Sequence, residues 1–309
     1  TPCTHEREPS LISFEVMPPR VPSAALKFWR TIDELLTARP DFLSVTYGAG
    51  GKDRSSAREV VAELARNAPV HSTVDVLDAV ADALDSGTRT FLALRGDPPA
   101  DDLDWEPEAG GVGSAIELIH LIRTVEKRRC DYHPAEALRA AFAPLTIAVA
   151  AFAAGNPAAG TSPLQEAERL LLKQAAGANF AITQLFWEAD TYLSFVERCR
   201  RLGVTIPIVP GILPPTELAR LRRVTELSGI EVPAHIIDTL SGAQDPESRH
   251  ELGVGLAASL ADEVVKGGAP GVHLFTFNKA RPALDILSRL GHGPTPLPES
   301  ERFGASVTE

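Results

Sequence analysis

The sequence predicts an α/β protein of the (β/α)8 TIM-barrel class, built as a single domain. The first observation is a set of short apolar runs, nearly free of charge, of the kind typical of strands buried on both faces of a parallel sheet. The second is that longer stretches with apolar residues three or four positions apart separate these runs, as expected for helices. The third is that eight such pairs fit into 309 residues. An open doubly wound sheet has the same alternation and is the alternative.

The elements follow in order along the chain. The runs predict strands at residues 11–16, 42–46, 70–74, 90–94, 145–150, 180–184, 206–210 and 271–276. The amphipathic stretches predict helices at residues 24–38, 55–67, 76–86, 115–128, 163–176, 191–202, 215–227 and 280–290. Several of these helices are followed at once by a glycine, the residue that most readily ends a helix in the left-handed conformation: Gly87, Gly177, Gly203 and Gly291.

Two regions exceed one helix per strand. Residues 233–266 predict extra helices before the last strand, and a long loop after the fourth strand carries five acids and no base. We therefore expect a polar N-terminal arm at residues 1–10, a barrel at residues 11–292 and a Pro-rich C-terminal tail at residues 293–309.

Composition narrows the functional classes. With 44% apolar and 23% charged residues, the chain resembles an ordinary globular protein. A net charge of −11 argues against a broad basic face for nucleic acid. No run reaches the about 18 apolar residues of a membrane helix, and the polar first residues do not resemble a signal peptide. Three scattered cysteines without a CxxC pair favour a reduced, cytoplasmic protein. The oligomeric state is left open.

Glu15 is the most prominent candidate for chemistry. Barrel enzymes place reacting groups at the carboxyl ends of their strands, and Glu15 stands at such an end within an apolar run. Partial burial raises the pKa of a carboxyl group, which suits a general acid. The alternative is a structural ion pair with Arg20 or Arg95.

Two further polar residues follow predicted strands. Asp97 comes after a glycine that lets the backbone approach a ligand, although Asp97 could instead cap a turn. Gln184 ends another strand, and its amide can donate and accept at once, as the edge of a heteroaromatic ring requires. A hydrogen bond from Gln184 to a loop is the structural alternative. His71 lies inside an apolar strand and fits a core histidine as well as a site residue.

The sequence shows no motif for a metal site, a serine or cysteine nucleophile, or an aldolase lysine. The histidines show no metal-ligand spacing, so no metal is predicted. Nucleophile elbows are missing, and no lysine stands at the inward position that a barrel aldolase needs. A carbon–carbon lyase is therefore disfavoured.

At these residues the sequence resembles the methylenetetrahydrofolate reductases. Six segments match the family in order: SFE at 13–15 with PPR at 18–20, SVTYGA at 44–49, ALRGD at 93–97, AGAN at 176–179 with ITQ at 182–184, PGILP at 210–214 and HLFTFN at 273–278. The resemblance implies a barrel that reduces 5,10-methylenetetrahydrofolate to 5-methyltetrahydrofolate with NAD(P)H, by way of a non-covalent FAD.

The resemblance also implies roles for single residues. Glu15 matches the acid that opens the methylene bridge, and Asp97 and Gln184 match the pterin-binding pair. Phe275 and Lys279 stand where the family has a substrate-binding Tyr and Arg. Six residues match flavin contacts: Thr46, Tyr47, His71, Leu94, Arg95 and Gly96.

The matching positions for the rest of the flavin site are substituted. Ser114, Phe152 and Asn156 replace aromatic and histidine side chains of the family. On the following helix, Arg169, Leu172 and Lys173 stand where the family has Asn, Arg and Lys for the FAD phosphates, so only the lysine remains of that set. A diphosphate needs paired donors and positive charge. We therefore expect direct hydride transfer from NAD(P)H, with NADH favoured, and doubt FAD; Phe152 and Lys173 remain candidate cofactor contacts.

Two other functions stay open at this point. One is an ordinary FAD-dependent reductase with substituted contacts. The other is a folate-binding barrel without turnover, although binding alone would not require Glu15. The expected partners are a folate and a nicotinamide nucleotide.

Overall fold

A computed structural model describes residues 11–19, 21–45, 77, 80–81, 83–85, 88–94 and 112–298. Its strands form two four-stranded parallel sheets, with the orders β2-β1-β8-β7 and β3-β4-β5-β6. The strands are β1 (Leu11–Val16), β2 (Phe42–Val45), β3 (Thr90–Ala93), β4 (Thr146–Ala151), β5 (Phe180–Thr183), β6 (Ile208–Val209), β7 (Gly211–Ile212) and β8 (Gly271–Phe275). Each predicted strand within the described residues is confirmed, and the one at 70–74 lies outside them.

The two sheets meet at Pro210. Proline has no amide hydrogen, so it interrupts the ladder between β6, which lies within the predicted strand at 206–210, and β7, which lies beyond it. β6 pairs with β5, β7 pairs with β8, and the carbonyl of Pro210 accepts a hydrogen bond from the His273 amide at 2.9 Å. The strand order therefore runs continuously from β2 through β1, β8, β7/β6, β5 and β4 to β3. This order of parallel strands confirms the predicted α/β class.

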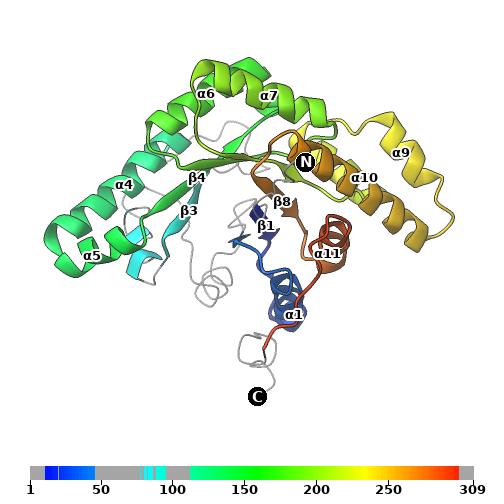
Figure 1. The fold of residues 1–309 in the computed structure, drawn as a ribbon, viewed down its shortest axis with the longest axis horizontal. Coiled ribbons are helices and arrows are strands. Elements are labelled where there is room, and N and C mark those ends of the chain that lie inside the picture. The colour runs from blue at the N-terminus through cyan, green and yellow to red at the C-terminus, as the bar shows by residue number, and fades with distance from the viewer. Residues whose placement is uncertain are drawn as a thin grey trace, which may run out of the picture.

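Helices cover the outer side of the strands (Figure 1). They are α1 (Ala25–Leu36), α4 (Ala115–Tyr132), α5 (Pro134–Phe142), α6 (Pro163–Ala175), α7 (Ala189–Leu202), α8 (Leu218–Ser228), α9 (Ala234–Ser241), α10 (Pro246–Lys266) and α11 (Ala280–Arg289). The helices α9 and α10 confirm the expected additions before the last strand. The helix α5 has no counterpart in the sequence prediction, and the predicted helix at 55–67 lies outside the described residues.

The core lies between the strands and the helices. Ile32 and Leu35 of α1, Ile119 of α4 and Ile286 of α11 are fully buried there. Gly177, Gly203 and Gly291 adopt positive φ angles of 112°, 96° and 87°, which confirms that they end helices in a conformation that glycine adopts most easily.

The described chain continues past the last helix to residue 298. Beyond α11, the amide of Thr295 donates to the carbonyl of Thr37 at 2.7 Å, which holds the chain against the end of α1. Cys130 and Cys199 are free thiols. Within the described residues, no helix combines the length and apolar character needed to cross a membrane.

Candidate active site at the carboxyl ends of the strands

Glu15 lies near the carboxyl end of β1, where two neighbouring strands flank it. Its register partners are Ser44 on β2 and Phe275 on β8. The hydroxyl of Thr276 donates to the backbone carbonyl of Glu15 at 2.6 Å, so the strand is fixed at this residue through its main chain. The Glu15 residue is half-buried. Glu15 is thus one residue from the carboxyl end of β1, the end of the strands at which barrel enzymes carry out their chemistry.

The turn after β8 holds the next part of β1. The side chain of Asn278 accepts from the Met17 amide at 2.8 Å and donates to the Met17 carbonyl at 2.6 Å. Phe277 and Asn278 both adopt positive φ, at 48° and 56°. Asparagine tolerates this conformation, whereas for an aromatic residue it is strained and is typical of functional sites. The turn therefore ties β1 and β8 together at the edge where Glu15 lies.

An apolar aromatic layer lies below this edge, on three strands. The rings of Phe42 and Phe180 have centroids 5.6 Å apart, and the imidazole of His273 stacks on Phe42 at 6.2 Å. The Ser13 hydroxyl and His273 Nδ1 are 2.8 Å apart. Burial lowers the pKa of His273 to about 3, so this ring stays neutral at physiological pH. The layer of side chains below Glu15 is therefore uncharged.

Gln184 follows β5 at the same edge. Its amide donates to the carbonyl of Ala151, the last residue of β4, at 2.7 Å. Its side-chain Oε1 accepts from the Leu185 amide at 2.9 Å. No partner for its Nε2 is found within the described residues, so this donor can serve a ligand.

Phe275 lies between Gln184 and Glu15 along the carboxyl edge of the strands. The Phe275 ring lies edge-on to His273, with centroids 5.3 Å apart, and it packs over the backbone of Gly211. The amide of Gly211 donates to the hydroxyl of Thr183, the residue before Gln184, at 2.9 Å. The structure thus places Glu15, Phe275 and Gln184 along one edge.

Lys279 belongs to a charged cluster beside this edge that the sequence did not reveal. Its ammonium group is ion-paired with Glu217, which also pairs with Arg220 at 3.2 Å. The Arg220 guanidinium lies over the Phe277 ring, 5.0 Å from its centroid. Burial acts to raise the pKa of Glu217, but the hydrogen bond from Lys279 and the charges of Arg220 and Lys279 outweigh it, and the pKa falls below its usual value. The cluster carries one net positive charge.

The helix α6 uses its cations internally. The ammonium group of Lys173 donates to the carbonyl of Ala150 on β4 at 2.7 Å, and burial lowers its pKa against the opposing charge of Glu166. Arg169 pairs with the buried carboxylate of Glu166 at 2.8 Å. Leu172 is exposed on the same helix. Both cations already have partners and the third side chain has no polar group, so this set offers a diphosphate fewer free donors than Asn, Arg and Lys would.

The other substituted positions also have structural roles. The hydroxyl of Ser114 caps α4 by accepting from the Glu117 amide at 3.2 Å. The side chain of Asn156 accepts from the Ala159 amide at 3.3 Å and so caps a short 3₁₀ turn. Phe152 follows β4 and is half-buried, whereas Leu94 is exposed at the end of β3. Six expected site residues lie outside the described part of the chain: Thr46, Tyr47, His71, Arg95, Gly96 and Asp97.

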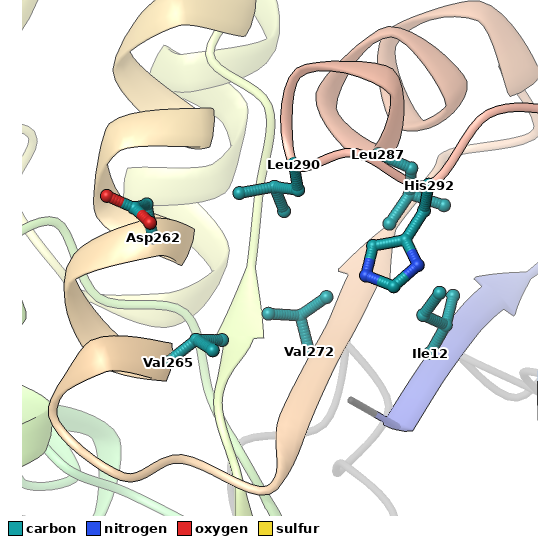
Figure 2. A pocket seen from close by; sticks show the side chains of 7 residues that line it. All are labelled: Ile12, Asp262, Val265, Val272, Leu287, Leu290 and His292. Atoms are coloured by element: carbon teal, nitrogen blue, oxygen red, sulfur yellow. The ribbon is translucent and has the colours of Figure 1, made fainter. Parts of the chain in front are cut away.

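A small cavity of about 100 Å³ lies elsewhere in the fold (Figure 2). Ile12 and Val272, near the amino ends of β1 and β8, line it together with residues of α10 and α11. Apolar side chains such as Leu287 and Leu290 line it together with the polar side chains of Asp262 and His292. Because barrel chemistry occurs at the opposite ends of the strands, we assign no catalytic role to this cavity.

Comparison with known proteins identifies the family. The family model described as methylenetetrahydrofolate reductase matches residues 3–291. The chain belongs to this family. A 5,10-methylenetetrahydrofolate reductase of Escherichia coli K12 is 30% identical over 296 residues, which cover 92% of this chain and 91% of that protein. The family resemblance read from the sequence motifs is thereby confirmed.

Longer members of the reductase family also match. A probable methylenetetrahydrofolate reductase (NADH) of rice is 30% identical over 304 residues, covering 91% of this chain and 48% of that protein. The chain therefore spans about half the length of the rice relative. A solved structure of an uncharacterized Clostridium thermocellum protein, which binds two copies of 5-methyl-5,6,7,8-tetrahydrofolic acid, is similar with a TM-score of 0.55 and 13% identity. The alignment covers 93% of this chain and 94% of that one and supports the fold.

Proposed function

We propose that this chain reduces 5,10-methylenetetrahydrofolate to 5-methyltetrahydrofolate with NADH. Its family and the name of the E. coli relative support the reaction, and the name of the rice relative supports NADH. The observation that carries the proposal is the placement of Glu15, Phe275 and Gln184 along one strand edge, above a layer of uncharged side chains. The scattered free cysteines remain our ground for proposing a cytoplasmic enzyme.

The proposed chemistry begins with ring opening. Glu15 donates a proton to N10 as the bond between N10 and the bridging carbon breaks, which leaves an iminium at N5. A hydride from C4 of NADH then adds to the exocyclic iminium carbon, which forms the N5-methyl group and NAD⁺. The side chains around His273 are uncharged and buried, which limits the access of water to the iminium.

The remaining residues bind and orient the folate. The free Nε2 of Gln184 donates to the pterin edge, and Asp97 provides the carboxylate that accepts from the pterin and offsets the iminium charge. The Phe275 ring packs against the folate beside Glu15. Lys279 attracts the folate carboxylates from the charged cluster with Glu217 and Arg220. We propose that seven further residues contact the nicotinamide nucleotide: Thr46, Tyr47, His71, Leu94, Arg95, Gly96 and Phe152.

We further propose that the hydride passes directly from NADH to the folate, without FAD. An FAD diphosphate would compete with Glu166 for Arg169 and with the Ala150 carbonyl for Lys173. The loss of one such charge-assisted hydrogen bond costs about 1.5–3 kcal/mol. An iminium already accepts hydride readily, so the reaction does not require a relay.

The purified protein is therefore expected to show no flavin absorbance and to oxidise NADH when methylenetetrahydrofolate is added. The measurement is an absorbance spectrum of the native protein, followed by NADH oxidation with and without added FAD. The product should be 5-methyltetrahydrofolate, identified by mass spectrometry. Stoichiometric FAD whose removal abolishes activity would overturn direct transfer but keep the reductase assignment. Folate binding without NADH oxidation under either condition would overturn the reductase assignment itself.

Gln184→Ala tests the proposed pterin site. Removing the amide leaves pterin groups unpaired, so we expect folate affinity to weaken by about 1–3 kcal/mol while NADH affinity is unchanged. Isothermal titration with each ligand measures both. Gln174→Ala is the control, because Gln174 lies on α6 and bonds the amide of Thr205 at 2.6 Å, away from the strand edge. If Gln184→Ala lost affinity for NADH and kept its affinity for folate, Gln184 would belong to the nucleotide site and not to the pterin site.

A further inference from the structure

The backbone pairing between β1 and β8 ends at the residue proposed as the acid. The last register pair of these two strands is Glu15 with Phe275. Beyond this pair the chain leaves β8 and turns into α11, which begins at Ala280. The ladder with β8 therefore stops at the point where a general acid needs a fixed position.

Two side chains of the turn after β8 continue the hold on β1. The Thr276 hydroxyl donates to the carbonyl of Glu15 at 2.6 Å. The Asn278 carboxamide accepts from the Met17 amide at 2.8 Å and donates to the Met17 carbonyl at 2.6 Å. A carboxamide that exchanges both bonds with one residue's backbone imitates the peptide groups of a neighbouring strand. The turn thus holds β1 on both sides of Val16.

The Thr276 hydroxyl is fully used in this arrangement. It accepts from the Asn278 amide at 3.1 Å, so its single hydrogen is directed to the Glu15 carbonyl. Thr276 is 3% exposed, so water has little access to these bonds. A valine of the same shape would therefore leave both backbone groups without this partner.

The backbone of the turn is strained where these bonds form. Phe277 and Asn278 are consecutive residues with positive φ angles, 48° and 56°. Such a conformation persists only where surrounding contacts hold it, and it concentrates at functional sites. Here the Arg220 guanidinium lies 5.0 Å from the centroid of the Phe277 ring, and Lys279 is ion-paired with Glu217. The start of α8 thus holds the strained turn while the turn holds β1.

We propose that Thr276 and Asn278 are positioning residues, which place Glu15 for proton transfer through the backbone of β1. The inference rests on the proposed function, in which Glu15 protonates N10 of the folate. A displacement of about 1 Å in a reacting group can slow a reaction about 100-fold. Thr276 is buried and its hydroxyl is fully used, so its effect on turnover passes through Glu15.

Thr276→Val removes the hydroxyl and keeps the shape of the side chain. We expect kcat to fall about 10-fold with an unchanged KM for NADH, because Glu15 is displaced but not removed. Thr276→Ser, which keeps the hydroxyl, should bring kcat back close to the wild-type value. Thr31→Val is the control, because Thr31 is a buried threonine of α1 whose hydroxyl also donates to a backbone carbonyl, that of Lys27, at 3.0 Å.

Asn278→Gly tests the second side chain. Glycine adopts a positive φ angle without strain, so this variant keeps the backbone of the turn and loses only the two bonds to Met17. It should lower kcat as well, again with an unchanged KM for NADH.

A double-mutant cycle separates positioning from a loss of stability. In the Glu15→Gln background no acid is left to place, so adding Thr276→Val should leave the residual kcat unchanged. A general loosening of the site would lower kcat by the same factor in both backgrounds. The rates are measured below the melting temperature of each variant, and Asn278→Gly carries the same cycle if Thr276→Val does not fold.

The outcomes distinguish this inference from the function on which it rests. A normal kcat in both turn variants, or an equal loss in the presence and absence of Glu15, would overturn the inference and leave the reductase intact. A wild-type chain that does not oxidise NADH with methylenetetrahydrofolate would overturn the proposed function itself. Normal turnover by Glu15→Gln would overturn the assignment of the acid, and the inference with it.

Discussion

Glu15→Gln is expected to lower kcat by about 100-fold or more while the protein folds normally, the loss typical for removal of a general acid. Glutamine keeps the size of the side chain but cannot supply the proton that opens the methylene bridge. The fold should tolerate the change, because Thr276 holds residue 15 through its backbone carbonyl, which glutamine retains. In free-energy terms the loss is about 2.7 kcal/mol of transition-state stabilisation.

Steady-state NADH oxidation measures the loss of kcat, and a thermal melt tests whether the variant folds normally. Glu34→Gln is the matched control, because Glu34 is an exposed carboxylate on α1, away from the strand edge. The control should retain both activity and melting temperature. If Glu15→Gln turned over at nearly the normal rate, Glu15 would be a structural carboxylate and the acid would have to be sought elsewhere.

The parts of the fold that could be predicted are those that depend on pattern alone. Runs nearly free of charge are typical of strands buried on both faces, and they identified every described strand except β7, which lies beyond the predicted run at 206–210. The helix α5 was not predicted because the barrel plan expects one helix between consecutive strands, and α4 already fills that place between β3 and β4. The strand β7 was not predicted because the predicted run ends at Pro210, whereas the chain pairs again directly after this residue.

In the candidate site, too, some features could be predicted from the sequence and others could not. Glu15 and Gln184 could be found because a polar residue at the end of an apolar run is visible in the sequence. The pairing of Arg169 with Glu166 and of Lys173 with a backbone carbonyl depends on which neighbour each cation meets, which residue type alone does not fix. The cluster around Glu217 was missed for the same reason, since Arg220 looks like any exposed arginine on a helix.

Gly211→Ala should have the largest effect on stability among the changes considered. A Cβ atom at this position would lie 2.1 Å from the Thr183 carbonyl oxygen and 2.8 Å from Cε2 of Phe275. The carbonyl belongs to β5 and cannot rotate away, so the strands would have to separate where the two sheets join. Overpacking of this kind costs about 3 kcal/mol. Urea denaturation measures the loss, and Gly293→Ala, which meets no atom within 4 Å, is the control.

The same substitution should also affect the proposed site. Moving the Phe275 ring displaces the surface that we expect to pack against the folate, and moving Thr183 shifts Gln184 next to it. The variant should therefore raise the KM for methylenetetrahydrofolate more than the KM for NADH, at a temperature where it remains folded. Because Glu15 lies on the other side of β8 from Gly211, kcat should fall less than in Glu15→Gln. An unchanged folate KM in a destabilised variant would show that the join between the sheets does not shape the folate site.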